Sequence, residues 1–152
     1  MRLVIASVGR FRGGPLQELY ADYAGRLPWS VELKEVEEKK PLKGEARKTR
    51  EAALLMGAVP DGATLIALDE NGRSMSSPDF AALLGRYADD GVQTLAFLIG
   101  GADGHSRETL ARADRLLSLG PMTWPHLMVR GLLAEQLYRA ASILSNHPYH
   151  RA

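Results

Sequence analysis

The spacing of hydrophobic residues alternates along the chain between the period of a strand and that of a helix. Apolar runs at 3–8, 63–68 and 94–99 indicate strands, and the last two are typical of strands buried on both faces of a parallel sheet. Apolar and charged residues alternate at 29–36, which predicts a half-exposed strand, and a short strand is expected before Gly120. Helical spacing predicts one helix at 16–27 and another at about 127–145. A further helix is expected after the polar stretch 37–50, ending near Ala58.

Turn and capping residues set the expected boundaries between these elements. Residues 69–72 are expected to end the strand at 63–68, and Ser77 followed by Pro78 predicts the N-cap of a helix that reaches about Asp90. Ser106 predicts the N-cap of another helix that extends to about Leu116. This order of elements predicts a single α/β domain over 1–152, with a mainly parallel sheet and helices on both faces.

The composition narrows the possible classes of protein. Of the 152 residues, 45% are hydrophobic and 24% charged, which is ordinary for a globular domain. There is no cysteine, so disulfides and thiolate chemistry are excluded, and a cytoplasmic protein is expected. The N-terminal apolar run is too short for a membrane span or a signal peptide. A net charge of +1 excludes a simple polycationic binder of nucleic acid, and no metal site is expected.

Glycines and apolar residues follow three predicted strands, where parallel α/β sheets bind ligands. The segments are Leu68-Asp69, Gly100-Gly101-Ala102-Asp103-Gly104 and the stretch 119–126. Glycine lets a ligand approach the backbone, but a strand-to-helix turn needs glycine for steric reasons as well. Neither a dinucleotide fingerprint nor a phosphate loop is present. The apolar residues of 122–124 favour a ligand with an aromatic ring and few negative charges.

The C-terminal residues 146–152 contain two histidines, a tyrosine and an arginine. Terminal segments are usually poorly ordered unless they dock, so this tail is either part of a site or a plain surface extension. Glu135 and Arg139 have the spacing of an ordinary helix ion pair.

These motifs occur together, in an order that resembles the ribosomal RNA large-subunit methyltransferase H family of the SPOUT class. The resemblance covers the whole chain and depends on several motifs at matching intervals. They are Leu68-Asp69, Ile99-Gly100-Gly101-Ala102-Asp103-Gly104, Met122-Thr123-Trp124-Pro125-His126, Arg130, Glu135-Gln136-Leu137-Tyr138-Arg139-Ala140 and His147-Pro148-Tyr149-His150.

The resemblance implies methyl transfer from S-adenosylmethionine to N3 of a pseudouridine in large-subunit ribosomal RNA, within the ribosome. It also implies a homodimer and a C-terminal trefoil knot that forms the cofactor pocket. The cofactor contacts implied by position are Leu68, Gly100, Leu119, Gly120, Pro121, Met122, Thr123 and Trp124. Candidates for removing the N3 proton or stabilising the anion are His126, Arg130, Tyr149, His150 and Arg151, with the tail entering the partner's pocket.

Contact with RNA is expected from local basic clusters, since the net charge is small. The larger cluster comprises Lys39, Lys40, Lys43, Arg47, Lys48 and Arg50, and the smaller one Arg10 and Arg12. Neighbouring glutamates make a merely solvated face equally compatible with the larger cluster. Three other functions stay open: a methyltransferase of transfer RNA or of another ribosomal position, a non-catalytic RNA-binding module, and an unrelated small-molecule enzyme.

Overall fold

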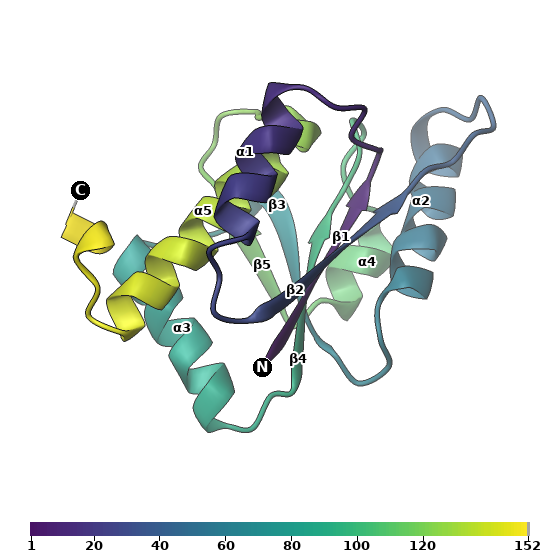
Figure 1. Ribbon diagram of the computed structural model, residues 1–152. Helices are drawn as coiled ribbons and strands as arrows, with labels where there is room; N and C mark the ends of the chain where they lie inside the picture. Colours follow the sequence, from purple (N-terminus) through teal and green to yellow (C-terminus); the bar gives the residue numbers. More distant parts are fainter. Residues whose placement is uncertain (152) are drawn as a thin grey trace.

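A five-stranded parallel sheet organises the chain (Figure 1), and the computed structural model describes residues 1–151. The strand order is β2-β1-β4-β3-β5. The elements in chain order are β1 (Arg2–Val8), α1 (Pro15–Ala24), β2 (Ser30–Val36), α2 (Gly44–Ala58), β3 (Thr64–Ser74), α3 (Ser77–Asp89), β4 (Thr94–Ile99), α4 (Arg107–Arg112), β5 (Arg115–Ser118), α5 (His126–Leu144) and a 3₁₀ turn, η1 (Pro148–Arg151).

The two central strands carry the most buried residues, as their continuous apolar runs predict. Residues 3–8 of β1 and 95–99 of β4 are buried, and Ser7 is the single polar residue among them. All five predicted strands are present, and each neighbouring pair in the sheet is parallel. The parallel α/β architecture with helices on both faces is therefore confirmed.

The helices form one layer on each face of the sheet. Figure 1 shows α1, α5 and α3 side by side on one face, with α2 and α4 on the other. The larger core cluster lies under the first layer and contains Leu133 and Leu137 of α5 together with Phe97 of β4. The last helix thus crosses the middle of the sheet, and its first turn lies near the carboxyl ends of the strands.

Residues 69–72 do not end β3 as predicted but form an excursion within it. Leu68 and Arg73 both pair with Leu117 of β5, so the four residues between them leave the ladder and the strand then resumes to Ser74. A Cβ atom on Gly72 would lie 2.7 Å from the backbone carbon of Leu116, so this crossing requires glycine. The excursion extends outward beyond the strand end.

The start of α3 and the end of α4 differ from the prediction. The N-cap of α3 is Ser76, whose hydroxyl accepts a hydrogen bond from the Asp79 amide at 3.2 Å, whereas Ser77 donates to Gln136 of α5 at 2.7 Å. Helix α4 begins after its predicted cap, Ser106, but ends at Arg112. It ends early because Asp114 exchanges two 2.8 Å hydrogen bonds with Leu65 of β3 and so starts β5.

Helix α2 begins at Gly44, inside the predicted polar stretch. Its first turns carry the ion pair Lys48–Glu45 near the surface and the ion pair Arg47–Glu51, in which Glu51 is buried. Helix α1, in turn, ends at Ala24, before Leu27.

Candidate active site

A cleft of about 970 Å³ lies at the carboxyl ends of β3, β4 and β5. Its walls are the excursion in β3, the glycine turn that follows β4 (residues 100–105), the loop 119–124 that follows β5, and the start of α5. It brings together all but one of the predicted cofactor contacts: Leu68, Gly100, Leu119, Gly120, Met122, Thr123 and Trp124. Pro121 does not line this cleft. Segments from three strand ends thus meet at one site.

The glycine turn presents backbone to the cleft. The Gly104 amide donates to the Gly101 carbonyl at 3.0 Å, and Gly104 has a φ of +79°. A Cβ atom on Gly100 would lie 3.1 Å from the carbonyl carbon of Gly104, which is backbone and cannot move aside. The turn therefore closes only with glycine at position 100.

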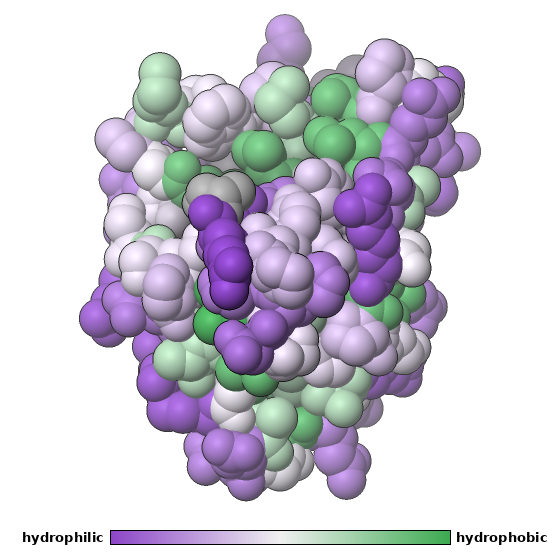
Figure 2. Space-filling model, turned by 60° about the vertical axis from the view of Figure 1, so that its left-hand side comes forward, coloured by the Kyte–Doolittle hydropathy of each residue, from purple (hydrophilic) through white to green (hydrophobic). Residues whose placement is uncertain are grey.

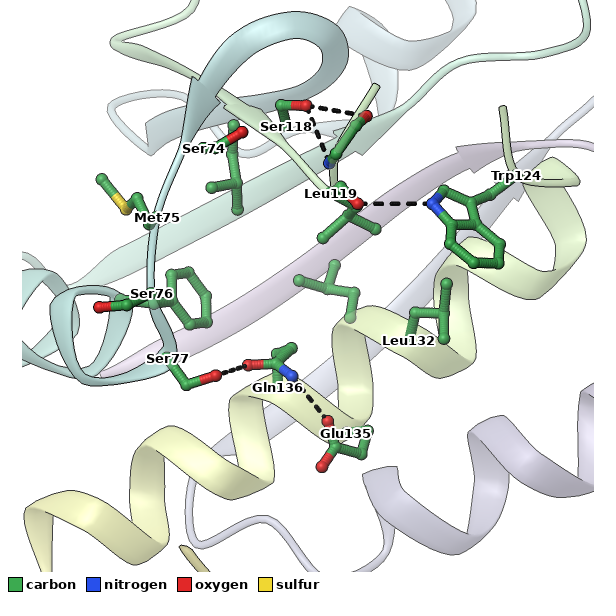
Figure 3. A pocket seen from close by; sticks show the side chains of 14 residues that line it. Ser74, Met75, Ser76, Ser77, Ser118, Leu119, Trp124, Leu132, Glu135 and Gln136 are labelled. Carbon is green, nitrogen blue, oxygen red and sulfur yellow. Dashed lines mark hydrogen bonds between the residues drawn. The ribbon is translucent and has the colours of Figure 1, made fainter. Parts of the chain in front are cut away.

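The loop 119–124 is held by short hydrogen bonds at its start (Figure 3). The Ser118 hydroxyl lies 3.1 Å from the carbonyls of Glu70 and Gly120 and accepts from the Gly120 amide at 3.0 Å. The Trp124 indole donates to the Leu119 carbonyl at 3.4 Å, whereas the Met122 side chain is 70% exposed.

A second cavity, of about 430 Å³, also touches this loop and is the one drawn in Figure 3. Its other walls are the segment 74–77 and α5, joined by the Ser77–Gln136 hydrogen bond. The loop therefore has open space along the main cleft and along α5.

His126, the first residue of α5, lines the main cleft. Its ring covers Gly9 at the end of β1, where a Cβ atom would lie 3.0 Å from Nε2. Burial, followed by the positive charge of Arg130, lowers the pKa of His126. The imidazole is therefore neutral at pH 7 and can accept a proton.

Arg130 does not line the cleft, although it lies one turn beyond His126. Its side chain is 0% exposed. The guanidinium donates to Glu35 Oε2 at 2.7 Å and to the carbonyls of Val8 and Gly9 at 3.0 and 2.7 Å. It also lies over the Phe11 ring, 4.6 Å from the centroid. In this protomer Arg130 orients α5 against β1 and β2 rather than facing a ligand.

The C-terminal tail docks at the opposite end of α5 as the turn η1. The Tyr149 hydroxyl contacts the Glu135 carboxylate at 3.0 Å and the Tyr23 hydroxyl at 3.2 Å. Burial, then the hydrogen bonds with Tyr23 and Glu135, raises the pKa of Tyr149 above its usual range. A phenol with a raised pKa is protonated at neutral pH, so Tyr149 does not act as a base in this geometry. Its hydrogen bonds instead anchor the tail to Glu135 and Tyr23.

Tyr149, His150 and Arg151 do not line the cleft of their own protomer. The Nδ1 atom of His150 is buried without a hydrogen-bond partner among the described residues. Helix α5 has 19 residues and is roughly 28 Å long at 1.5 Å per residue. His126 and Arg130 lie in the first two turns of this helix, whereas the tail residues follow its last turn, and the Tyr149 side chain reaches back to Glu135 at the midpoint of the helix.

The predicted basic clusters are partly neutralised. Arg47 and Arg50 pair with Glu51 and Glu38, and Arg10 and Arg12 lie within 3.6 Å of Glu37. Lys48 pairs with Glu45 at 3.6 Å and also reaches the rim of the cleft. Within residues 1–151, Lys39, Lys40 and Lys43 form no ion pair.

Two residues of the cleft have no distinct signal in the sequence. His105 is the last residue of the glycine turn, and Arg107 begins α4. The described part of the chain contains neither a group of three potential metal ligands nor a helix long and apolar enough to cross a membrane.

Comparison with known proteins identifies the class to which this fold and cleft belong. The family model described as predicted SPOUT methyltransferase matches residues 1–150. The chain therefore belongs to the SPOUT methyltransferases. Its relatives in Rhodospirillum centenum and Paramagnetospirillum magneticum are both named ribosomal RNA large subunit methyltransferase H. The first is 56% identical and covers 100% of each chain, and the second is 58% identical and covers 99% of each.

Solved structures share the fold at much lower identity. A probable methylase family protein from Haemophilus influenzae has a TM-score of 0.60 at 13% identity, over 97% of this chain and 67% of that one. A probable methyltransferase from Bordetella pertussis has a TM-score of 0.55 at 16% identity, over 91% of this chain and 95% of that one. These similarities concern the fold alone.

Removing the Glu35 carboxylate is expected to destabilise the protein because it leaves Arg130 buried without a counter-charge. We expect Glu35→Ala to lower the free energy of unfolding by about 2–3 kcal/mol. The matched control is Glu32→Ala on the same strand, whose ion pair with Arg2 is half-exposed and contributes less than about 1 kcal/mol. Urea unfolding measures both variants, and equal losses would contradict a structural role for the buried pair.

Proposed function

We propose that this protein transfers a methyl group from S-adenosylmethionine to N3 of a pseudouridine in large-subunit ribosomal RNA. The observation that carries the proposal is the convergence of three strand-end segments on a single cleft that has a neutral imidazole at its edge. The names of the full-length relatives support the same activity. We infer the class of RNA from those names. We infer the methylated atom from the family resemblance that the sequence motifs carry.

The residues of the cleft fit the cofactor. The closed glycine turn and the loop 119–124 offer backbone N–H and C=O groups that can read an adenine edge, beside apolar walls from Leu68 and Met122. The cofactor supplies a methyl group that is already activated by its sulfonium charge. The chain must then align the nucleophile with this methyl group and remove the N3 proton.

His126 is our first candidate for the proton acceptor. It lines the cleft, and its lowered pKa keeps the imidazole neutral at pH 7. Arg130 would act through His126 and the end of β1, because its side chain is buried and both of its terminal nitrogens donate to Glu35 or to the carbonyls of Val8 and Gly9.

A second protomer would complete the site. Large apolar side chains are exposed on α1, on α5 and on the loop before α5: Leu19, Leu144, Met122 and Trp124. Figure 2 shows one face of the molecule, on which hydrophobic and hydrophilic residues are interspersed. We propose that the protein packs on a second copy through these exposed side chains, forming a homodimer, and that His150 and Arg151 enter the partner's cleft.

The path of the chain supports the trefoil knot implied by the sequence motifs. The edge strand β5 lies beside β3, yet α5 packs against α1, α3, β1 and β4. The connection 119–125 therefore returns across the sheet past the segment 74–77, and the two segments line the same cavity (Figure 3).

The basic residues near the strand ends suit contact with RNA phosphates. Lys39, Lys40 and Lys43 lie between β2 and α2, and Lys48 and Arg107 lie at the rim of the cleft. Because the net charge is only +1, we propose that recognition depends on a preformed ribosomal surface in the cytoplasm rather than on naked RNA.

Methylation by the purified protein tests the proposed function directly. With radiolabelled S-adenosylmethionine, we expect label in ribosomes, little in naked ribosomal RNA and none in transfer RNA. Mass mapping should place the methyl group on one pseudouridine. Label in transfer RNA alone would show that transfer RNA, and not ribosomal RNA, is the substrate. A lack of saturable cofactor binding by calorimetry would indicate a non-catalytic module.

A side chain at position 100 should impair cofactor binding because it disturbs the closed glycine turn. Gly100→Ala places a Cβ atom 3.1 Å from backbone, so the turn must open, and we expect at least about a tenfold loss of cofactor affinity by calorimetry. Gly57→Ala in α2 is the matched control because nothing lies within 4 Å of its Cβ position. If Gly100→Ala binds the cofactor with wild-type affinity, the glycine turn is not part of the binding site.

Mixed dimers test whether the tail acts in the partner's cleft. One protomer carries His150→Ala with Arg151→Ala, the other carries Gly100→Ala, and different tags isolate the mixed dimer. At a cofactor concentration well below the dissociation constant of Gly100→Ala, each variant alone should be nearly inactive. The mixed dimer holds one intact composite site and should reach about half the wild-type rate. An inactive mixed dimer, with both parent variants folded, would contradict action in trans.

A further inference from the structure

His105 is the one buried histidine among the described residues, at 8% exposure, and it has no part in the mechanism above. It is the last residue of the glycine turn and directly precedes Ser106, the N-cap of α4. Its side chain also lines the main cleft. A buried polar ring at this place needs a hydrogen-bond partner.

The partner is the carbonyl of Leu98, which lies 3.1 Å from His105 Nε2. A carbonyl can only accept, so Nε2 carries the proton. Burial lowers the pKa of His105, partly opposed by the Leu98 carbonyl, Asp69 and the Leu68 carbonyl. The neutral ring with its proton on Nε2 therefore satisfies the geometry at pH 7.

This hydrogen bond ties the far end of the turn to the strand from which the turn begins. Leu98 precedes Gly100 by two residues, and the Cβ position of Gly100 lies 3.3 Å from the His105 amide nitrogen. The ring also faces the Leu68 and Asp69 positions at the end of β3. It thus sits between the two strand ends whose backbone would hold the cofactor.

We propose that His105 is a positioning residue that latches the glycine turn onto β4 and so preorganises the backbone of the cofactor pocket. The inference rests on the proposed function. Without the latch, the turn would have to be ordered when the cofactor binds, and that ordering would reduce affinity. A positioning role of this kind affects cofactor affinity more than the rate at saturating cofactor.

Two substitutions separate the hydrogen bond from the volume of the side chain. Gln can place an amide N–H near the position of Nε2, whereas Leu fills space without a donor. We expect His105→Leu to weaken S-adenosylmethionine binding about tenfold by calorimetry and to raise the KM for the cofactor by a similar factor. The kcat at saturating cofactor should stay within about twofold of wild type, and His105→Gln should restore affinity to within about threefold.

Equal affinity in wild type and His105→Leu, or an equal loss in the Leu and Gln variants, would overturn the latch. Urea unfolding checks that each variant is folded. Should His105→Leu not fold, His105→Asn takes its place, because its shorter amide does not reach the Leu98 carbonyl. If the wild-type protein itself shows no saturable binding, the proposed function fails, and this outcome is distinct from a failure of the latch alone.

Discussion

The buried guanidinium of Arg130 is the constraint on which the arrangement of the site depends. A charged group without solvent is tolerated only where a counter-charge and hydrogen bonds replace the lost water. The two terminal nitrogens of Arg130 find both at the ends of β1 and β2, in Glu35 and in the carbonyls of Val8 and Gly9, whereas its buried Nε has no partner among the described residues. The first turns of α5 therefore have one position relative to the sheet. His126 lies four residues earlier on the same helix face. The fixed position of Arg130 therefore also fixes His126 over Gly9.

The other walls of the cleft are loops, and each is fixed by a local contact of its own. Ser118 holds the start of the loop 119–124, and the Leu98 carbonyl holds His105 at the end of the glycine turn. Both contacts join a side chain to backbone, so the remaining backbone groups of the loops stay available to a ligand. Main-chain groups and apolar side chains line this cleft, together with charged side chains at Lys48, Asp69, Glu70, Asp103 and Arg107. Such a cleft suits a cofactor with an adenine ring and a positive sulfonium.

The sequence predicts the strands well because their signal is local, and it misses features that depend on distant partners. Runs such as 94–99 are apolar throughout, and β4 has these bounds. The excursion at 69–72 depends on the pairing of Arg73 with Leu117, and the early end of α4 depends on Asp114 binding Leu65. The cofactor contacts were predicted from motifs, whereas the burial of Arg130 against Glu35 joins residues 95 positions apart and has no local pattern.

The two ends of α5 explain why a second protomer suits the proposed chemistry. At the far end, Tyr149 packs edge-on against Tyr138 with ring centroids 4.6 Å apart, and the Arg139 guanidinium lies 5.0 Å from the Tyr149 centroid. These contacts order the tail before any partner arrives, which lowers the entropic cost of docking it into a second cleft. Tyr149 is anchored at Glu135, nine residues along α5 from His126, so about half of the helix, roughly 13 Å at 1.5 Å per residue, separates this anchor from the start of the helix at the cleft. In the proposed homodimer, the same anchor that orders the tail would present His150 and Arg151 to the neighbouring molecule.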